Sequence, residues 1–186
     1  MTNSSIGRHI FETALGWMAV TWSAEGLTRV WLPERERESV LRRVEKREAN
    51  LPDAPLSPVI AAVVESLKSY AAGEEVDFST VPLDLSGIDD FRLAIYDAAK
   101  ALHYGETVTY GELAKRAGHP GLARETGAAL GQNPLPIVVP CHRILAAGNK
   151  IGGFSAPGGS RTKEKMLAME GVRVGPPPPA QASLPL

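Results

Sequence analysis

The strongest constraint on the fold is a change of sequence pattern near Asp90. Residues 73–89, GEEVDFSTVPLDLSGID, contain short β-prone pieces without a helical period, which predicts a strand and a linker. A chain of 186 residues suits one large domain or two small ones. We therefore expect an α+β protein with an N-terminal α+β domain at 1–87 and a second domain at 88–175. The proline run that opens residues 176–186 predicts a disordered tail.

The sequence patterns in the first half of the chain predict a small α+β unit. Residues 16–32 alternate in places around a polar turn at 23–26, which is typical of a β-hairpin. Residues 34–48 carry charges of both signs and predict a solvated helix. Apolar residues between Ile60 and Ala71 recur at helical spacing and predict a second helix. No pattern in this half indicates a chemistry.

The sequence patterns in the second half of the chain predict mainly helices. Apolar side chains between residues 91 and 102 lie on one helical face. Residues 109–112, TYGE, fit the capping box that marks a helix start, and this helix ends at the Gly-His-Pro-Gly turn 118–121. A second helix is expected over 122–132, ended by Asn133-Pro134. Two short helices joined by such a turn resemble a helix-turn-helix.

Composition excludes several classes of protein. The chain has one cysteine, so it can form neither an internal disulfide nor a multi-cysteine zinc cluster. No apolar run reaches the roughly 18 to 20 residues that a membrane helix needs. The N-terminus lacks the pattern of a signal peptide. We expect a soluble, cytoplasmic protein.

Charge is distributed unevenly although the net charge is only -1. Residues 1–89 carry 9 Lys+Arg and 14 Asp+Glu, a balance of -5, whereas residues 90–186 carry 11 and 7, a balance of +4. A surplus of four can arise by chance. With other evidence for a site in the second half, it favours an anionic partner for that half.

The only cysteine lies in an unusual context. A lone cysteine is commonly an inert core residue. Here the apolar run 137–139 ends next to Cys141, and His142 and Arg143 place groups beside the thiol that can favour the thiolate. The glycine-rich stretch 148–159 can lie over a pocket. A nucleophilic thiol is therefore the better interpretation.

Five motifs occur in order within residues 88–172: TYGELA, LARETGAAL, NPLPIVVPCHRI, GGFS and LAMEG. Together they resemble the O6-alkylguanine-DNA alkyltransferase family. The resemblance implies a small N-terminal ribonuclease-H-like α/β domain of unclear role. It also implies a mainly helical, winged-helix-like C-terminal domain that contains the helix-turn-helix.

The resemblance implies a nucleophilic displacement. Cys141 would take the alkyl carbon from O6 of guanine, or O4 of thymine, because such an attack needs a soft, deprotonated nucleophile. His142 would accept the thiol proton through a bridging water, Glu170 would orient His142, and Asn133 would tie the helix-turn-helix to the active-site segment. The thioether product cannot be cleaved, so each molecule acts once. Neither a cofactor nor a metal is implied.

The resemblance also implies base flipping, since chemistry on a paired base requires its extrusion. Small residues let the second helix approach the minor groove, Arg124 would replace the flipped nucleotide in the stack, and Tyr110 would crowd the 3′ phosphate and hydrogen-bond the guanine. The expected DNA-binding residues are Tyr110, Ala123, Arg124, Gly127 and Arg143, and the expected alkylguanine pocket consists of Pro136, Ile144, Ile151, Phe154, Ser155 and Lys163.

The expected partner is double-stranded DNA that contains O6-alkylguanine. We expect a monomer without an obligate protein partner, associated with the nucleoid when acting, or nuclear in a eukaryote. Three alternatives stay open. A non-catalytic lesion-binding protein of the same fold would lack the cysteine, a transcription regulator would carry polar base-reading side chains on its second helix, and a Cys-His hydrolase would turn over repeatedly.

Overall fold

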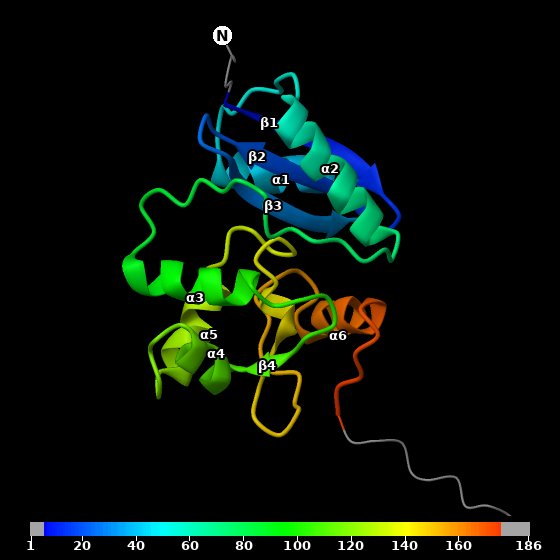
Figure 1. The fold of residues 1–186 in the computed structure, drawn as a ribbon. Coiled ribbons are helices and arrows are strands. Elements are labelled where there is room, and N and C mark those ends of the chain that lie inside the picture. Colours follow the sequence, from blue (N-terminus) through cyan, green and yellow to red (C-terminus); the bar gives the residue numbers. More distant parts are fainter. Residues whose placement is uncertain (1–5, 176–186) are drawn as a thin grey trace, which may run out of the picture.

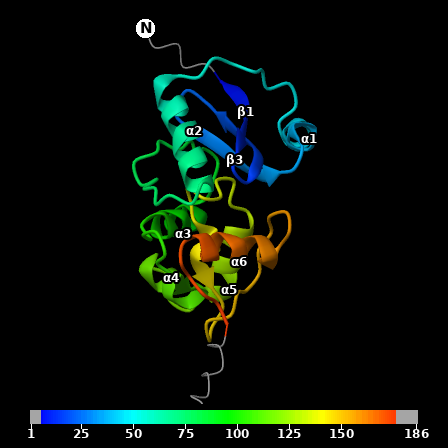
Figure 2. The same cartoon turned by 90° about the vertical axis from the view of Figure 1, so that its right-hand side faces the viewer.

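A computed structural model describes residues 6–175. The first half forms an antiparallel sheet in the order β1 (Gly7–Thr13), β2 (Gly16–Trp22) and β3 (Leu27–Glu34). Helix α1 (Arg37–Arg47) covers one face of this sheet and α2 (Pro58–Ala71) covers the other, as Figures 1 and 2 show. The sheet is therefore the middle layer of a small three-layer unit.

Alternation along the strands explains why both faces are covered. On β2, Ala19 packs with the α1 residues Val40 and Val44, whereas its neighbours Met18 and Val20 belong to the larger core on the α2 side. Successive side chains of a strand point to opposite faces, so a strand that is apolar at consecutive positions needs a partner on each side. The largely buried β2 fits this requirement.

Residues 73–89 form no strand, so that part of the prediction is wrong. The segment makes one isolated bridge, between Leu83 and Leu27 at the start of β3. The Leu27 N–H donates to the Pro82 carbonyl at 2.9 Å, and the Asp84 N–H donates to the Leu27 carbonyl at 2.9 Å. Proline has no N–H with which to extend such a ladder. The segment therefore runs along the sheet edge as an irregular connection.

The second half is mainly helical. It contains α3 (Asp90–Lys100), α4 (Tyr110–Arg116), α5 (Ala123–Gly131) and α6 (Ser160–Met169), with one short parallel pair between β4 (Val108–Thr109) and β5 (Ile144–Leu145). The Thr109 side chain accepts a hydrogen bond from the Glu112 N–H at 3.2 Å and fixes the start of α4 where the capping box predicts it. Helices α4 and α5 form the expected helix-turn-helix pair (Figure 1).

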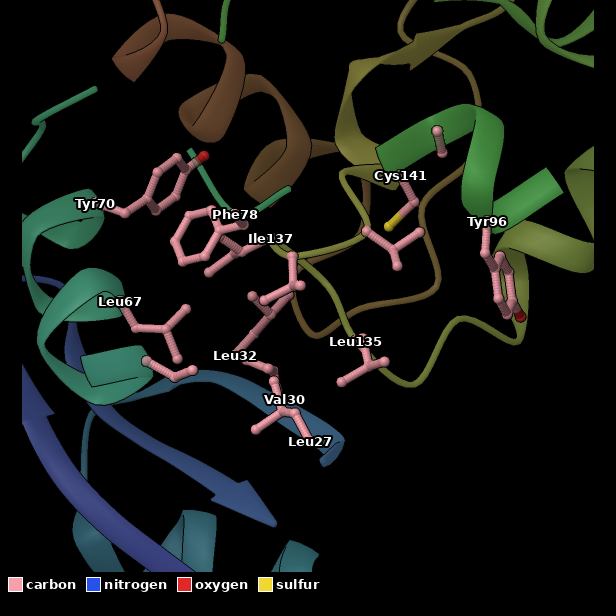
Figure 3. Packing of buried hydrophobic residues seen from close by; sticks show 14 of the residues in the cluster. Leu27, Val30, Leu32, Leu67, Tyr70, Phe78, Tyr96, Leu135, Ile137 and Cys141 are labelled. Carbon is pink, nitrogen blue, oxygen red and sulfur yellow. The ribbon is translucent and has the colours of Figure 1, made fainter. Parts of the chain in front are cut away.

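One hydrophobic core joins the two halves. Leu67 of α2 and Leu135 of the segment after α5 belong to the same buried cluster, and both are fully buried (Figure 3). The Val30 N–H of β3 also donates to the Pro134 carbonyl at 3.0 Å. The segment that leads to Cys141 thus rests directly on the first half.

The predicted α+β class, the hairpin and the helices are confirmed. Strand β1 was not predicted, because residues 7–13 alternate only weakly. The predicted tail 176–186 lies outside the described residues. Within residues 6–175, none of the helices is long and apolar enough to cross a membrane.

The shared core predicts that both halves unfold together. Leu135→Ala should lower the free energy of unfolding by about 2–5 kcal/mol, because it leaves a cavity in the core. All three tryptophans, Trp17, Trp22 and Trp31, lie in the first half. Chemical denaturation followed by tryptophan fluorescence and by far-UV circular dichroism should give the same, shifted midpoint. A fluorescence midpoint equal to that of the wild type would contradict the shared core.

Candidate active site

The segment around the cysteine is a series of tight turns. The Cys141 N–H donates to the Val139 carbonyl at 2.8 Å across Pro140, whose φ of -79° and ψ of 66° define an inverse γ-turn. A short 3-10 helix, Cys141–Arg143, follows immediately. Ile137 has a φ of 75°, which is strained for a β-branched residue. The apolar run is therefore no strand, and the surrounding contacts hold it in an unfavourable conformation.

Asn133 braces this series of turns. Its Nδ2 donates to the Val139 carbonyl at 2.8 Å, and its Oδ1 accepts from the Leu135 N–H at 2.9 Å. Asn133 lies just after α5, so it links the end of the second helix of the helix-turn-helix to the turn that presents Cys141.

A buried carboxylate, Glu170, lies at the centre of the polar network. Its Oε1 accepts hydrogen bonds from His142 Nε2 at 2.6 Å, the Tyr70 hydroxyl at 2.9 Å and Arg143 Nη2 at 3.1 Å. Its Oε2 accepts from Arg143 Nε at 2.8 Å and the Gly105 N–H at 3.0 Å. Burial works against ionisation, but the donated hydrogen bonds outweigh it and lower the pKa of Glu170 to about 2. Glu170 is therefore an anion that only accepts.

The end of α6 fixes the position of this carboxylate. The Val172 N–H donates to the Leu167 carbonyl at 2.8 Å, and the Gly171 N–H donates to the Ala168 carbonyl at 3.0 Å. Gly171 has a φ of 75°, the left-handed conformation that glycine adopts without strain. The sequence Glu-Gly-Val thus ends the helix and leaves Glu170 directed into the protein.

Glu170 determines the tautomer of His142. An ionised carboxylate has no proton to donate, so Nε2 of the imidazole carries the hydrogen of the 2.6 Å contact. Nδ1 is buried and has no hydrogen-bond partner among residues 6–175. Burial lowers the pKa of His142, although Glu170 acts in the opposite direction. His142 is therefore neutral near pH 7, with a basic nitrogen available.

The cysteine itself is a protonated thiol at rest. Burial raises the pKa of Cys141, while Asn133 and the positive charge of Lys163 act in the opposite direction. The side chain retains 9% exposure. Attack by this sulfur therefore requires loss of its proton during the reaction.

A cavity of about 540 Å³ opens above Cys141. Helices α4 and α5 form one wall and the loop 153–155 forms another. The Tyr110 hydroxyl donates to the Gly153 carbonyl at 3.3 Å, and the Ser155 hydroxyl donates to the Gly131 carbonyl at 3.0 Å, so the loop is tied to the helix-turn-helix. The lining residues are Tyr110, Ala123, Arg124, Gly127, Leu130, Gly131, Cys141, Gly153, Phe154 and Ser155.

Lys163 contacts three parts of the site: β5, the loop 153–155 and the ring of Tyr110. Its Nζ donates to the Ile144 carbonyl at 2.5 Å and to the Gly153 carbonyl at 3.3 Å, and lies 5.6 Å from the centre of the Tyr110 ring. Within the described part of the chain no carboxylate lies within 4.0 Å of it. Burial lowers its pKa to about 8. The ammonium group thus holds β5 and the loop together and contributes positive charge to the site.

Comparison with known proteins identifies the family. Residues 90–172 match the family described as "6-O-methylguanine DNA methyltransferase, DNA binding domain". A methylated-DNA–protein-cysteine methyltransferase of Methanosarcina acetivorans is 34% identical over 164 residues, which cover 87% of this chain and 96% of the relative. The chain belongs to this methyltransferase family. The predicted resemblance is confirmed.

Two further relatives agree with this assignment. A methylated-DNA–protein-cysteine methyltransferase of Mycolicibacterium paratuberculosis is 44% identical over 110 residues, which span 59% of this chain and 64% of that relative. The crystal structure of Mycobacterium tuberculosis OGT in complex with DNA aligns with a TM-score of 0.72 and 32% identity, covering 88% of this chain and 92% of that one. The fold therefore extends over both halves.

Most residues expected from family resemblance lie at one cavity. Tyr110, Ala123, Arg124, Gly127, Phe154 and Ser155 line it together with Cys141. Pro136 lines an adjoining hollow of about 160 Å³ that also reaches Cys141. Neither hollow is lined by Ile144 or Ile151. Ile144 is fully buried, and its carbonyl accepts from Lys163 instead.

Arg143 differs from its predicted role as a DNA contact. Its side chain is only 6% exposed, and it donates twice to Glu170 and, from Nη1, to the Leu102 carbonyl at 2.7 Å. A guanidinium whose donors are used inside the protein is not available to a phosphate. This geometry argues against a DNA contact and places Arg143 in the network that neutralises Glu170.

Sequence reasoning missed Tyr70 and Gly105, which both donate to Glu170. Tyr70 falls on the apolar face of the helix predicted between Ile60 and Ala71. A buried tyrosine needs a partner for its hydroxyl, which is the signal that could have drawn attention to it.

The buried network predicts a large effect of Glu170→Gln on stability. Loss of the charge leaves Arg143 without its partner, so the free energy of unfolding at pH 7 should fall by about 3–5 kcal/mol. The folded pKa of about 2 lies below the ordinary 4.5, so the carboxylate stabilises the fold above pH 4.5 and this contribution is lost as pH falls towards 2. Denaturation at several pH values should show the gap between wild type and variant closing over that range.

The matched control is Glu112→Gln, which removes a carboxylate whose ion pair with Arg116 is solvent-exposed. It should change stability by less than about 1 kcal/mol. Equal losses in the two variants would show that the buried network does not carry the effect.

Proposed function

We propose that this protein repairs DNA by direct reversal, transferring the alkyl group of O6-alkylguanine, and of O4-alkylthymine, to Cys141. The observation that supports this most strongly is the position of the only cysteine at the base of the cavity, between the helix-turn-helix and the loop 153–155. A volume of about 540 Å³ lies within the range of small-ligand pockets and is suited to one extruded base.

The displacement needs one proton acceptor and no second nucleophile. The Cys141 sulfur attacks the alkyl carbon, a carbon–sulfur bond forms, and the bond from that carbon to O6 breaks. The thiol proton passes through a bridging water to Nδ1 of His142, and Glu170 stabilises the imidazolium that results. The electron pair of the broken bond stays with the guanine, which takes up a proton from solvent. The thioether remains, so the protein reacts once.

Helix α5 is the proposed DNA-reading element. Arg124 is exposed at the cavity mouth, and Ala123 and Gly127 keep this face of the helix narrow. We propose that Arg124 enters the base stack as the damaged nucleotide leaves it, while Tyr110 crowds the backbone beside it. The balance of +4 in residues 90–186 supports this orientation towards a polyanion.

We further propose that the two halves correspond to a ribonuclease-H-like domain at 1–87 and a winged-helix-like domain at 88–175. The three-stranded antiparallel sheet with a helix on each face supports the first description. The helix pair α4–α5 with the short β4–β5 pair supports the second. We propose that the protein acts as a monomer, in the cytoplasm at the nucleoid or in a eukaryotic nucleus.

Incubation with an oligonucleotide duplex that contains one O6-methylguanine tests the activity. One methyl group should appear on the Cys141 peptide by mass spectrometry, and repair should stop at one equivalent of DNA per protein. Cys141→Ala should abolish transfer entirely. Repeated turnover, as a Cys-His hydrolase would show, or methylation elsewhere in the chain would overturn the proposal, and binding without transfer would favour a lesion-binding protein.

Arg124→Ala tests the flipping role. Unstacking a base costs a few kcal/mol, so loss of the residue that replaces it should slow repair in duplex DNA by about ten- to a hundredfold. Reaction with free O6-benzylguanine, which needs no flipping, should slow less than threefold. The control Lys115→Ala removes one exposed positive charge from α4 and should slow duplex repair less than Arg124→Ala. Equal losses on duplex and free base would refute the role.

A further inference from the structure

A side chain from the first half reaches the active-site network. Tyr70 lies near the end of α2, and its hydroxyl donates to Glu170 Oε1 at 2.9 Å and lies 3.3 Å from His142 Nε2. Figure 3 shows its ring extending from α2 towards the second half. Tyr70 and Glu170 are 100 residues apart in the chain, so only the docking of the two halves brings them together.

The protonation states fix the direction of these contacts. Burial, followed by the nearby charge of Glu170, raises the pKa of Tyr70 well above its ordinary value. The phenol therefore keeps its proton and donates it to the ionised carboxylate. The single hydroxyl proton points to Glu170, and the Nε2–H of His142 shares the same oxygen, Oε1.

Sharing of Oε1 has an electrostatic consequence. A hydrogen bond to a carboxylate oxygen withdraws charge from it, so less negative charge acts on the imidazole. Several titratable or charged groups face His142. They are Tyr70 of α2, Lys163 of α6, Glu170 at the end of α6, and the chain neighbours Cys141 and Arg143. Among these, only Glu170 favours the imidazolium strongly, and Tyr70 competes with His142 for it.

The ring of Tyr70 is held firmly. Its centre lies 6.1 Å from that of Phe78 and 6.4 Å from that of Tyr104, both in edge-to-face arrangements. The residue is 1% exposed. The hydrogen bond from Val30 to Pro134 is a second contact of the first half with the active-site segment. The first half therefore contacts both Glu170 and the segment before Cys141.

We propose that Tyr70 is a positioning residue through which the first half holds Glu170 against His142 and limits the charge of this carboxylate on the imidazole. The effect keeps His142 neutral and ready to accept the cysteine proton at mildly acidic pH. This role rests on the proposed alkyl transfer, but its physical basis can be measured without it. It also gives the first half a function in the chemistry.

The variant Tyr70→Phe keeps the ring and removes only the hydroxyl. Loss of the 2.9 Å bond to the charged acceptor should outweigh loss of the longer 3.3 Å contact with Nε2, so His142 should bind its proton more readily. NMR titration of the imidazole nitrogens should show the His142 pKa rising by about half a unit to one unit. The acid limb of the single-turnover repair rate should move to higher pH by the same amount.

Tyr104→Phe is the matched control. It removes a hydroxyl from the same aromatic cluster, but this hydroxyl donates to the Met169 carbonyl at 2.9 Å and not to the carboxylate. Its His142 titration should match the wild type. An unchanged or lowered His142 pKa in Tyr70→Phe, or an equal rise in both variants, would overturn the proposal. Failure of the wild type to transfer a methyl group would instead refute the proposed function, and the titration would still decide the role of Tyr70.

Discussion

The structure depends on the burial of one negative charge. Glu170, at the end of α6, receives five hydrogen bonds from three other parts of the chain: the end of α2, the loop at Gly105 and the turn Cys141–Arg143. A buried carboxylate without such partners would cost several kcal/mol. The pairing is satisfied only when the two halves are docked and the cysteine segment is folded. Assembly of the fold and assembly of the site are therefore the same event.

The same charge divides the site into a fixed part and an accessible part. The fixed part consists of the side chains that donate to Glu170, namely Arg143, Tyr70 and His142. The accessible part consists of Cys141, which faces the cavity, and Arg124, which lies at the cavity mouth. His142 joins the two, because Nε2 contacts the carboxylate and Nδ1 remains unpaired in the described structure. A proton acceptor of this kind suits a thiol that burial keeps protonated until a substrate arrives.

Features that depend on neighbouring residues could be predicted from the sequence. The capping box at Thr109 and the helical spacing from Ile60 to Ala71 each depend on contacts within one or two turns. The adjacency of Cys141 and His142 was informative for the same reason. Features that depend on distant partners could not be predicted. The direction of Arg143 is set by a carboxylate 27 residues away. Residues 73–89 have the local sequence pattern of a strand, but they contact β3 through Pro82 as an irregular connection. Family resemblance placed residues at the site but did not reveal the hydroxyl of Tyr70.

The most direct test of the central claim is the tautomer of His142 in the wild-type protein at neutral pH. The account predicts a neutral imidazole that carries its proton on Nε2, where Glu170 accepts it, and an unprotonated Nδ1. Nitrogen-15 NMR of the histidine ring distinguishes the two nitrogens. A proton on Nδ1, or an imidazolium at neutral pH, would contradict the account. The first form leaves only Nε2, which faces Glu170, without a proton, and the second leaves no basic nitrogen at all.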